Sequence, residues 1–351
     1  MLCAQTLIDP TVFSGPLLTD AGWLDVGDGH RVAWSSHGNP DGLPVLVLHG
    51  GPGSGASLKQ LDLFPLNACR VILMDQRGCG RSTPLGLLTA NTTARLVQDV
   101  TALRRHLGIR RWLLVGGSWG ATLAMACAQA DPQSCLGVLL RAPFLASEAD
   151  LQWFCVDAGR MRPQAHAHFT GLPALQACHG APTVAQLLDA YADAFEQGDV
   201  TALNRWLYWE ATLEQVLQPP TPEALIPSPE RLPLLMARAR IQTHYLRHQC
   251  FVDSARLRHG LRTLASVPCA IVQGDMDWVC LPANARAVQQ AWPGAVLHTV
   301  AQGTHSPFQG QMPWAVSHLV CQFVAHRRFT SPTDCSALAQ PVKPALDAGC
   351  A

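Results

Sequence analysis

The sequence predicts an α/β fold in which helices flank a mostly parallel sheet and a helical segment is inserted between two of its strands. Two observations lead to this prediction. In the first half of the 351 residues, short and uniformly apolar runs alternate with helical patterns, which is typical of strands buried on both faces of a parallel sheet. Residues 150–250 then show amphipathic helical stretches and no convincing strand, and strand-like runs return afterwards.

The predicted sheet begins with a hairpin, because Trp23–Val26 and Arg31–Ser35 flank Asp28-Gly29, a dipeptide typical of tight hairpin turns. Apolar runs that we expect to be strands follow at Val45–Leu48, Val71–Met74, Trp112–Val115, Val138–Leu140, Cys269–Val272 and Val296–Val300. Ala94–Leu107 places its apolar residues on one helical face, so it is expected to be a crossover helix between parallel strands. A last helix is expected around Trp314–His326.

The chain is predicted to divide into an α/β core, a helical cap and a tail. The core comprises residues 1–146 and 251–328, and the cap comprises residues 147–250. The cap includes amphipathic stretches such as Ala185–Glu196 and Leu203–Val216, and a proline-dense connector follows them. Residues 329–351 are rich in Ser, Pro, Ala and Gly, so we expect a mobile tail.

Composition excludes several classes of protein. A hydrophobic fraction of 48% supports a large buried core, and the balance of 25 basic against 25 acidic residues offers no basic surface for nucleic acid. Trp112–Ala130, the least charged long stretch, is interpreted as a buried strand, turn and helix rather than a membrane span. The N-terminus lacks the features of a signal peptide, and the thirteen cysteines contain no C-x-x-C pair. We therefore expect a cytoplasmic protein whose cysteines are mostly reduced.

The segment Gly116-Gly117-Ser118-Trp119-Gly120 carries the strongest chemical signal. It follows a predicted buried strand and precedes the helix-like Ala121–Gln129, which is the context in which G-x-S-x-G forms a nucleophile elbow. The sharp turn lifts the serine oxygen clear of the sheet, and the helix N-terminus directs amide hydrogens at developing negative charge. The motif therefore predicts Ser118 as the nucleophile of an α/β-hydrolase fold.

A serine nucleophile needs a base that is oriented by a carboxylate, and α/β hydrolases place them in the chain order Ser, acid, His. Both partners are expected on loops that follow strands. Asp277 is the predicted acid, and Asp275 is the alternative because sequence alone does not resolve two residues of spacing. His305 is the predicted base.

The segment His49-Gly50-Gly51-Pro52-Gly53 directly follows the predicted strand Val45–Leu48. It is similar to the glycine-rich loops that supply an oxyanion-hole amide. We expect the Gly51 and Trp119 N–H groups to be the two donors. The pattern of a phosphate-binding loop, with its Gly-Lys-Ser/Thr, is absent from the sequence.

Together these motifs resemble the proline iminopeptidase family, the prolyl aminopeptidases of the α/β-hydrolase fold. The resemblance is close from residue 25 to residue 144 and rests on Gly38–Gly42, His49–Gly53, Asp75–Ser82, Asn91–Thr93 and Gly116–Gly120. It implies a helical cap over the site and release of an N-terminal proline from peptides without a metal or cofactor. The implied partner is a small peptide or amide with a free N-terminal amine, with no role for nucleic acid or membrane.

The resemblance also implies carboxylates in the cap that hold the cationic amine. Trp206–Glu210 is similar to the family's Trp-Glu motif, so Glu210 is the predicted amine anchor, with a solvated helix glutamate as the alternative. Arg240–Tyr245 matches a second motif, Arg-Ile-Glu-x-His-Tyr, but has Gln242 at its carboxylate position. A glutamine can accept a hydrogen bond there but carries no charge.

A further departure from the family is Ala142-Pro143, which stands in Leu140–Phe144 where the family has Gly-Ile. Together with Gln242 it motivates an alternative function, namely an esterase or amidase of the same fold that acts on another small acyl substrate. A non-catalytic ligand-binding member that kept the pocket is the other alternative.

Overall fold

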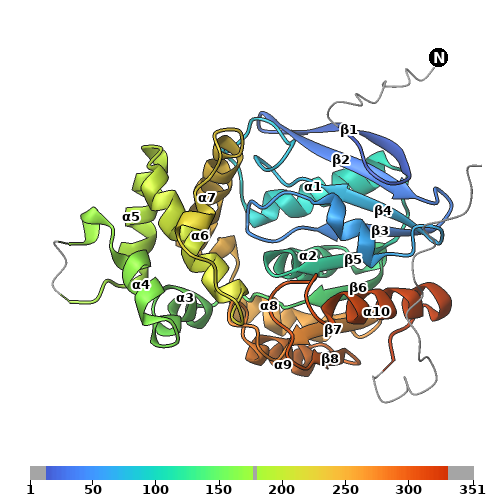
Figure 1. The fold of residues 1–351 in the computed structure, drawn as a ribbon. Helices are drawn as coiled ribbons and strands as arrows, with labels where there is room; N and C mark the ends of the chain where they lie inside the picture. Colours follow the sequence, from blue (N-terminus) through green and yellow to red (C-terminus); the bar gives the residue numbers. More distant parts are fainter. Residues whose placement is uncertain (1–12, 177–179, 331–351) are drawn as a thin grey trace, which may run out of the picture.

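A computed structural model describes residues 13–176 and 180–330 of the chain (Figure 1). The N-terminal residues on which the cytoplasmic prediction partly depends lie outside these ranges, and so does the predicted tail after Thr330. Phe329, the first residue of the predicted tail of residues 329–351, is instead buried and stacks on Phe323 with ring centroids 4.8 Å apart.

One eight-stranded sheet forms the centre of the molecule, in the order β1-β2-β4-β3-β5-β6-β7-β8. Its strands are β1 (Leu18–Gly27), β2 (His30–Gly38), β3 (Leu43–Leu48), β4 (Cys69–Met74), β5 (Trp112–Gly117), β6 (Cys135–Arg141), β7 (Cys269–Gly274) and β8 (Val296–Val300). β2 pairs antiparallel with both β1 and β4, and all pairs from β4 to β8 are parallel. The predicted hairpin and mostly parallel sheet are therefore confirmed.

The sheet is buried on both faces, and β3 shows why its strands are uniformly apolar. Leu46 and Leu48 pack into one hydrophobic core, whereas Val45 and Val47 pack into the other.

The helices are α1 (Thr93–His106), α2 (Trp119–Ala130), α3 (Glu148–Cys155), α4 (Pro163–Thr170), α5 (Val184–Glu196), α6 (Val200–Glu214), α7 (Leu232–Arg247), α8 (Ser254–Gly260), α9 (Pro282–Ala291) and α10 (Met312–His326). Helices α1, α2 and α9 cover the first face, and α10 covers the second.

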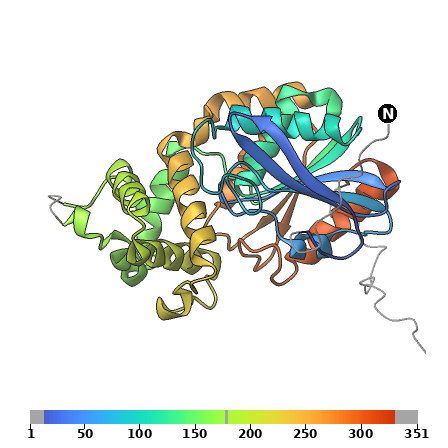
Figure 2. The same cartoon turned by 90° about the horizontal axis from the view of Figure 1, so that it is seen from above.

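Helices α3–α7 come between β6 and β7 in the chain and group together at one end of the sheet layer, on the left in Figures 1 and 2. Their interior is aromatic. Trp206 and Trp209 of α6 are fully buried, Trp209 stacks on Phe169 of α4, and Trp206 meets Tyr191 of α5 edge-on. These contacts set the rotation of α6 about its axis. The division into core and cap at residues 147 and 250 remains our prediction.

Asn91, in the motif that precedes α1, joins this helical group to the sheet. The Tyr245 hydroxyl of α7 donates to Asn91 Oδ1 at 2.8 Å, and the His244 ring lies 3.1 Å from the Asn91 carbonyl oxygen. The Asn91 amide in turn donates to the Arg77 carbonyl at 3.0 Å. Buried hydrogen bonds of this kind hold α7 in one position relative to the strand ends.

The cysteines in the described ranges are free thiols, and all of them except Cys321 are buried. Burial raises the pKa of Cys69 and of Cys155 to about 12, so these thiols stay protonated near neutral pH. In the same ranges, no helix is long and apolar enough to cross a membrane.

Candidate active site

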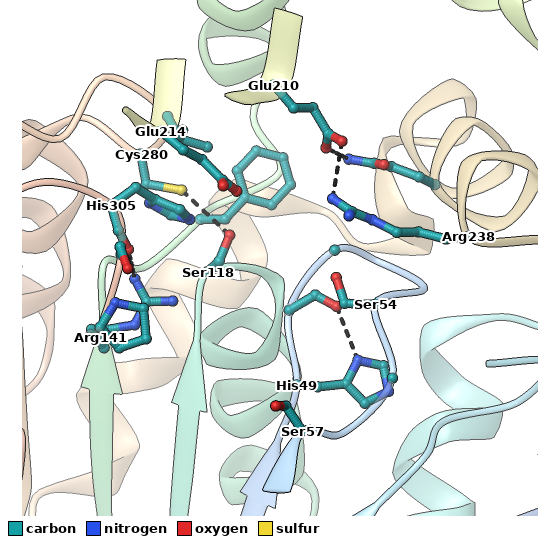
Figure 3. Close-up of a pocket in the computed structure, with 18 of the residues that line it drawn as sticks. His49, Ser54, Ser57, Ser118, Arg141, Glu210, Glu214, Arg238, Cys280 and His305 are labelled. Carbon is teal, nitrogen blue, oxygen red and sulfur yellow. Dashed lines mark hydrogen bonds and ion pairs between the residues drawn. The ribbon is translucent and has the colours of Figure 1, made fainter. Parts of the chain in front are cut away.

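A cavity of about 350 Å³ lies where the loops after several parallel strands meet the inserted helices (Figure 3). The loops that follow β3, β5, β6, β7 and β8 supply one side of its lining, and α3, α6 and α7 supply the other. The carboxyl ends of parallel strands converge at one edge of a sheet, so residues from distant parts of the sequence meet there. Ser118 and His305 both line this cavity.

Ser118 occupies the turn between β5 and α2 with φ 57° and ψ −124°, a conformation that is strained for any residue with a side chain. The flanking glycines make the turn possible. A Cβ on Gly116 would overlap the Gly120 carbonyl oxygen, and a Cβ on Gly120 would overlap the Leu48 carbonyl oxygen of β3. A side chain at either position would collide with backbone atoms, so only glycine fits there, as the sequence motif predicts.

His305 and Asp277 form a buried pair on the loops after β8 and β7. The His305 Nδ1 lies 2.9 Å from Asp277 Oδ2 and 3.1 Å from Oδ1. The backbone amides of Val279 and Cys280 each donate to Asp277 Oδ1 at 2.9 Å. With Nδ1–H directed at the carboxylate, the Nε2 atom of His305 is left to accept a proton. The alternative acid, Asp275, is exposed and does not contact His305.

Ser118 Oγ has Cys280 Sγ as its side-chain neighbour, at 3.8 Å. Within the described residues it makes no hydrogen bond to His305, although Figure 3 shows both side chains beside Cys280 at the base of the cavity. Catalytic hydrogen bonds of this type often tighten only when substrate binds. Cys280 was not predicted from the sequence, because its neighbours there give no signal.

The predicted oxyanion loop is held by Gln76. Its backbone amide donates to His49 Nε2 at 3.0 Å, its side-chain amide donates to the His49 carbonyl at 2.9 Å, and its Oε1 accepts from Trp119 Nε1 at 2.9 Å. His49 Nδ1 donates to the Gly50 carbonyl at 3.0 Å, and burial lowers the pKa of His49, so the ring is neutral. Gly51 has φ +112° and lines the cavity. Gln76 thereby joins His49, two residues before Gly51, to the side chain of Trp119.

Glu210 and Gln242 meet where α6 faces α7, and both side chains are buried. Gln242 Nε2 donates to Glu210 Oε1 at 2.6 Å, while Gln242 Oε1 accepts from Trp206 Nε1 at 3.1 Å. Arg238 Nη2 forms an ion pair with Glu210 Oε2 at 2.9 Å. Burial raises the pKa of Glu210, and Arg238 opposes that shift. Glu210 is therefore not a solvated helix glutamate, and both of its oxygens have a partner.

Sequence reasoning missed the other charged residues of the cavity, namely Arg141, Glu214 and Arg238. Spacing could have identified two of them. Glu214 follows Glu210 by four residues, and Arg238 precedes Gln242 by four, so each shares a helix face with a residue that was predicted. Arg141 is the last residue of β6, belongs to the altered motif Leu140–Phe144, and donates a hydrogen bond to the His305 carbonyl oxygen.

No group of three or more His, Cys, Asp or Glu side chains in residues 13–176 and 180–330 is arranged to hold a metal ion. The side chains of the site offer a serine in a strained turn, a histidine paired with a carboxylate, and a glycine-rich loop beside a helix N-terminus. These are the parts of an acyl-transfer site.

The fold and this site define a hydrolase of the α/β-hydrolase class. The model of the α/β-hydrolase fold family matches residues 44–309. Among solved structures, the proline iminopeptidase of Mycobacterium smegmatis superposes with a TM-score of 0.57 at 20% identity and covers 88% of this chain and 98% of its own. An esterase from Exiguobacterium antarcticum superposes with a TM-score of 0.57 at 17% identity, covering 89% of this chain and 100% of its own. These structures support the fold.

Relatives of higher identity identify the family. The proline iminopeptidase of Xylella fastidiosa is 36% identical over 310 residues, which are 86% of this chain and 95% of that protein. That of Arabidopsis thaliana is 34% identical over 311 residues, or 86% of this chain and 80% of that protein. That of Neisseria meningitidis is 34% identical over 314 residues, or 87% and 96%. The chain belongs to the proline iminopeptidase family, as the motifs predict.

Proposed function

We propose that the chain is a serine aminopeptidase that releases an N-terminal proline from small peptides or amides in the cytoplasm. The observation that carries this proposal is the cavity in which Ser118, at the elbow, lies with the His305–Asp277 pair below a set of cap carboxylates. The relatives named proline iminopeptidases, which match most of the chain, support the choice of substrate.

In the proposed reaction, Ser118 Oγ turns from Cys280, transfers its proton to His305 Nε2 and attacks the carbonyl carbon of the N-terminal residue. Asp277 stabilises the imidazolium, and the Gly51 and Trp119 amides stabilise the oxyanion. His305 then gives the proton to the leaving nitrogen, and the shortened peptide departs. His305 next takes a proton from water, which attacks the ester carbon of the acyl-enzyme. The bond to Ser118 Oγ breaks, proline is released, and His305 returns the proton to the serine oxygen. No metal or cofactor takes part.

Cleavage of prolyl 4-nitroanilide by the purified chain tests the proposal. Ser118→Ala is expected to reduce kcat by a factor of at least about 10³, because the nucleophile is lost while the oxyanion donors remain. Ser54→Ala is the matched control, since Ser54 also lines the cavity, and its activity is expected to stay near that of the wild type. A fluorophosphonate should label Ser118. Absence of that adduct would favour a ligand-binding protein without catalysis.

An esterase or amidase that acts on a neutral acyl group is the second candidate. Two observations favour it: Arg238 already neutralises Glu210, and the neighbouring position holds Gln242, which is uncharged. A neutral acyl ester with the same nitroaromatic group distinguishes the two candidates. Rapid cleavage of the ester with no cleavage of the prolyl anilide would contradict the peptidase assignment.

A further inference from the structure

The charged side chains of the cavity do not all have the same freedom to bind a substrate. Arg238 is paired with Glu210, and Arg141 hydrogen bonds to the His305 carbonyl oxygen. Glu214 lines the same cavity, yet among the described residues its carboxylate makes no hydrogen bond and no ion pair. It is the one cavity carboxylate without a hydrogen-bond or ion-pair partner among those residues, and Arg141 and Arg238 act on it only through longer-range electrostatics.

Helix α6 directs Glu214 toward the reacting centre. Glu210 and Glu214 are one turn apart on the same face, because the tryptophans at 206 and 209 are fixed in the aromatic interior. In Figure 3 the Glu210 carboxylate turns toward Arg238, whereas the Glu214 side chain extends toward Ser118 and Cys280.

The end of α6 adds to the attraction for a cation. Glu214 is the last residue of this helix, where the backbone carbonyl groups form the negative end of the helix dipole. A carboxylate at that end is unfavourable for the isolated helix, and a bound cation relieves the repulsion. The helix end and the side chain therefore favour the same kind of ligand.

Substrate geometry requires the amine to bind near Ser118. The amine nitrogen is joined through a single Cα to the carbonyl carbon that the serine attacks, so the two atoms are about 2.5 Å apart. A cation at Glu210 would have to displace Arg238 or the Gln242 amide, and Arg238 would repel it. At Glu214 the amine has no partner to displace among the described residues, and Arg238, which is paired with Glu210, acts on this position only over a longer distance.

We propose that Glu214, rather than Glu210, binds the protonated N-terminal amine of the substrate, and that Arg238 and Gln242 hold Glu210 as an internal part of the cap. This inference rests on the proposed aminopeptidase activity and names its specificity-determining residue. Glu214 lies outside both cap motifs that the family resemblance identified.

Two substrates that differ only in charge and in the scissile bond test the inference: prolyl 4-nitroanilide, and the 4-nitrophenyl ester of cyclopentanecarboxylic acid, which has a carbocycle in place of the imino ring. Glu214→Gln should raise KM for the prolyl substrate about ten- to a hundredfold, the range expected when a charge-assisted hydrogen bond is lost. KM for the ester should change less than about twofold. Glu214→Asp, which keeps the charge, should recover part of the prolyl affinity.

The double variant Glu210→Gln/Arg238→Gln is the matched control, because it removes the anion and the cation together and leaves no unpaired buried charge. It should keep the preference for the prolyl substrate. The inference is overturned if this double variant loses that preference while Glu214→Gln retains it. An equal rise in KM for both substrates with Glu214→Gln would also overturn it, since the role would then be structural.

Binding without turnover separates this inference from the proposed function. Calorimetry would measure L-prolinamide binding to Ser118→Ala and to Ser118→Ala/Glu214→Gln, with a ten- to hundredfold loss expected in the second protein. Equal affinities would overturn the role of Glu214. Prolinamide that binds through Glu214 but is not hydrolysed by the wild type would leave the amine site standing and contradict the peptidase assignment.

Discussion

At the scale of single residues, Gln242 stands where the family motif has a glutamate, and this difference changes how Glu210 is held. Both ends of its amide are used: the nitrogen donates to Glu210 and the oxygen accepts from Trp206. A carboxylate at this position could accept from Trp206 but could donate to Glu210 only when protonated. Both ends of the Gln242 amide are therefore engaged by the cap itself, which agrees with our proposal that Gln242 supports Glu210.

This arrangement predicts the stability of Gln242→Glu. A carboxylate at position 242 would replace the amide that lies 2.6 Å from Glu210 Oε1. Two carboxylates this close are expected to share a proton, so the pKa of the pair should rise above the usual value for glutamate. A raised pKa in the folded state gives stability that is present at low pH and lost as pH rises through the folded pKa. Urea denaturation should therefore show a larger loss of unfolding free energy at pH 8 than at pH 5.

Gln242→Leu is the control for this prediction, because it removes the same hydrogen bonds without adding a charge. Its loss of unfolding free energy should be the same at both pH values, about 1–3 kcal/mol for the polar groups left without partners. If Gln242→Glu loses the same unfolding free energy relative to the wild type at pH 5 and at pH 8, the two carboxylates do not face each other.

At the scale of elements, the loop after β4 contains the motif Asp75–Ser82, which adds no catalytic side chain to the candidate site. Its contacts show that it supports the site instead. Asp75 Oδ1 accepts from the Ala56 amide at 2.6 Å, and its Oδ2 accepts from Arg81 Nε at 2.8 Å. Gln76 binds both His49 and Trp119. The loop therefore supports the glycine-rich segment from behind, and we expect the geometry of the proposed oxyanion hole to depend on it.

The neutral ring of His49 makes this support sensitive to pH. Burial lowers the pKa of His49 below 6.5, and protonation of Nε2 would abolish the bond that it accepts from the Gln76 amide. The unfolded chain takes up this proton more readily, so the contribution to stability is present above pH 6.5 and is lost as pH falls. The unfolding free energy of His49→Gln should fall less steeply than that of the wild type between pH 7.5 and 5.5.

Urea denaturation at several pH values would measure these slopes. His259→Gln serves as the comparison, because His259 is exposed on α8 and far from the loop in sequence. Its slope should match that of the wild type. If removal of His49 leaves the slope unchanged as well, the titration of this ring is not coupled to folding.

At the scale of the whole molecule, Arg77 joins segments that are distant in the sequence. Its buried guanidinium donates to both oxygens of Asp99 in α1, at 2.7 and 2.8 Å, and to Asp28 at the β1–β2 turn, at 3.0 Å. It also donates to the Val26 and Ala90 carbonyl oxygens at 3.0 and 2.9 Å. Only the planar fork of arginine can make all of these bonds at once.

Arg77→Lys is therefore expected to lower the free energy of unfolding by about 3 kcal/mol, because a buried charge network loses most of its hydrogen bonds. Arg77 does not line the cavity, so KM should be unchanged. Guanidinium denaturation and steady-state kinetics would measure both effects.

Arg95→Lys is the control: Arg95 is 45% exposed and also pairs with Asp28, at 3.3 Å. It should cost less than about 1 kcal/mol. If the two variants lose equal unfolding free energy, the buried position of Arg77 adds nothing to the stability that its ion pairs provide.

The sequence by itself determined the sheet, the elbow and the strand-end loops of this protein. Strands such as Val45–Leu48 are recognisable because burial on both faces demands an apolar residue at every position, and the elbow is recognisable because collisions exclude all residues but glycine around Ser118. These constraints are local, so they are visible in a few consecutive residues.

Only the tertiary structure decided which groups meet in space. Asp277 and Asp275 differ by two positions on one loop, and the packing of the β7 and β8 loops places the first against His305 and leaves the second exposed. The rotation of α6 against α7 pairs Glu210 with Arg238 and leaves Glu214 without a hydrogen-bond or ion-pair partner among the residues that the structure describes. A helix carries its periodicity in its own sequence, but the partner that each face meets is set by the packing of the whole chain.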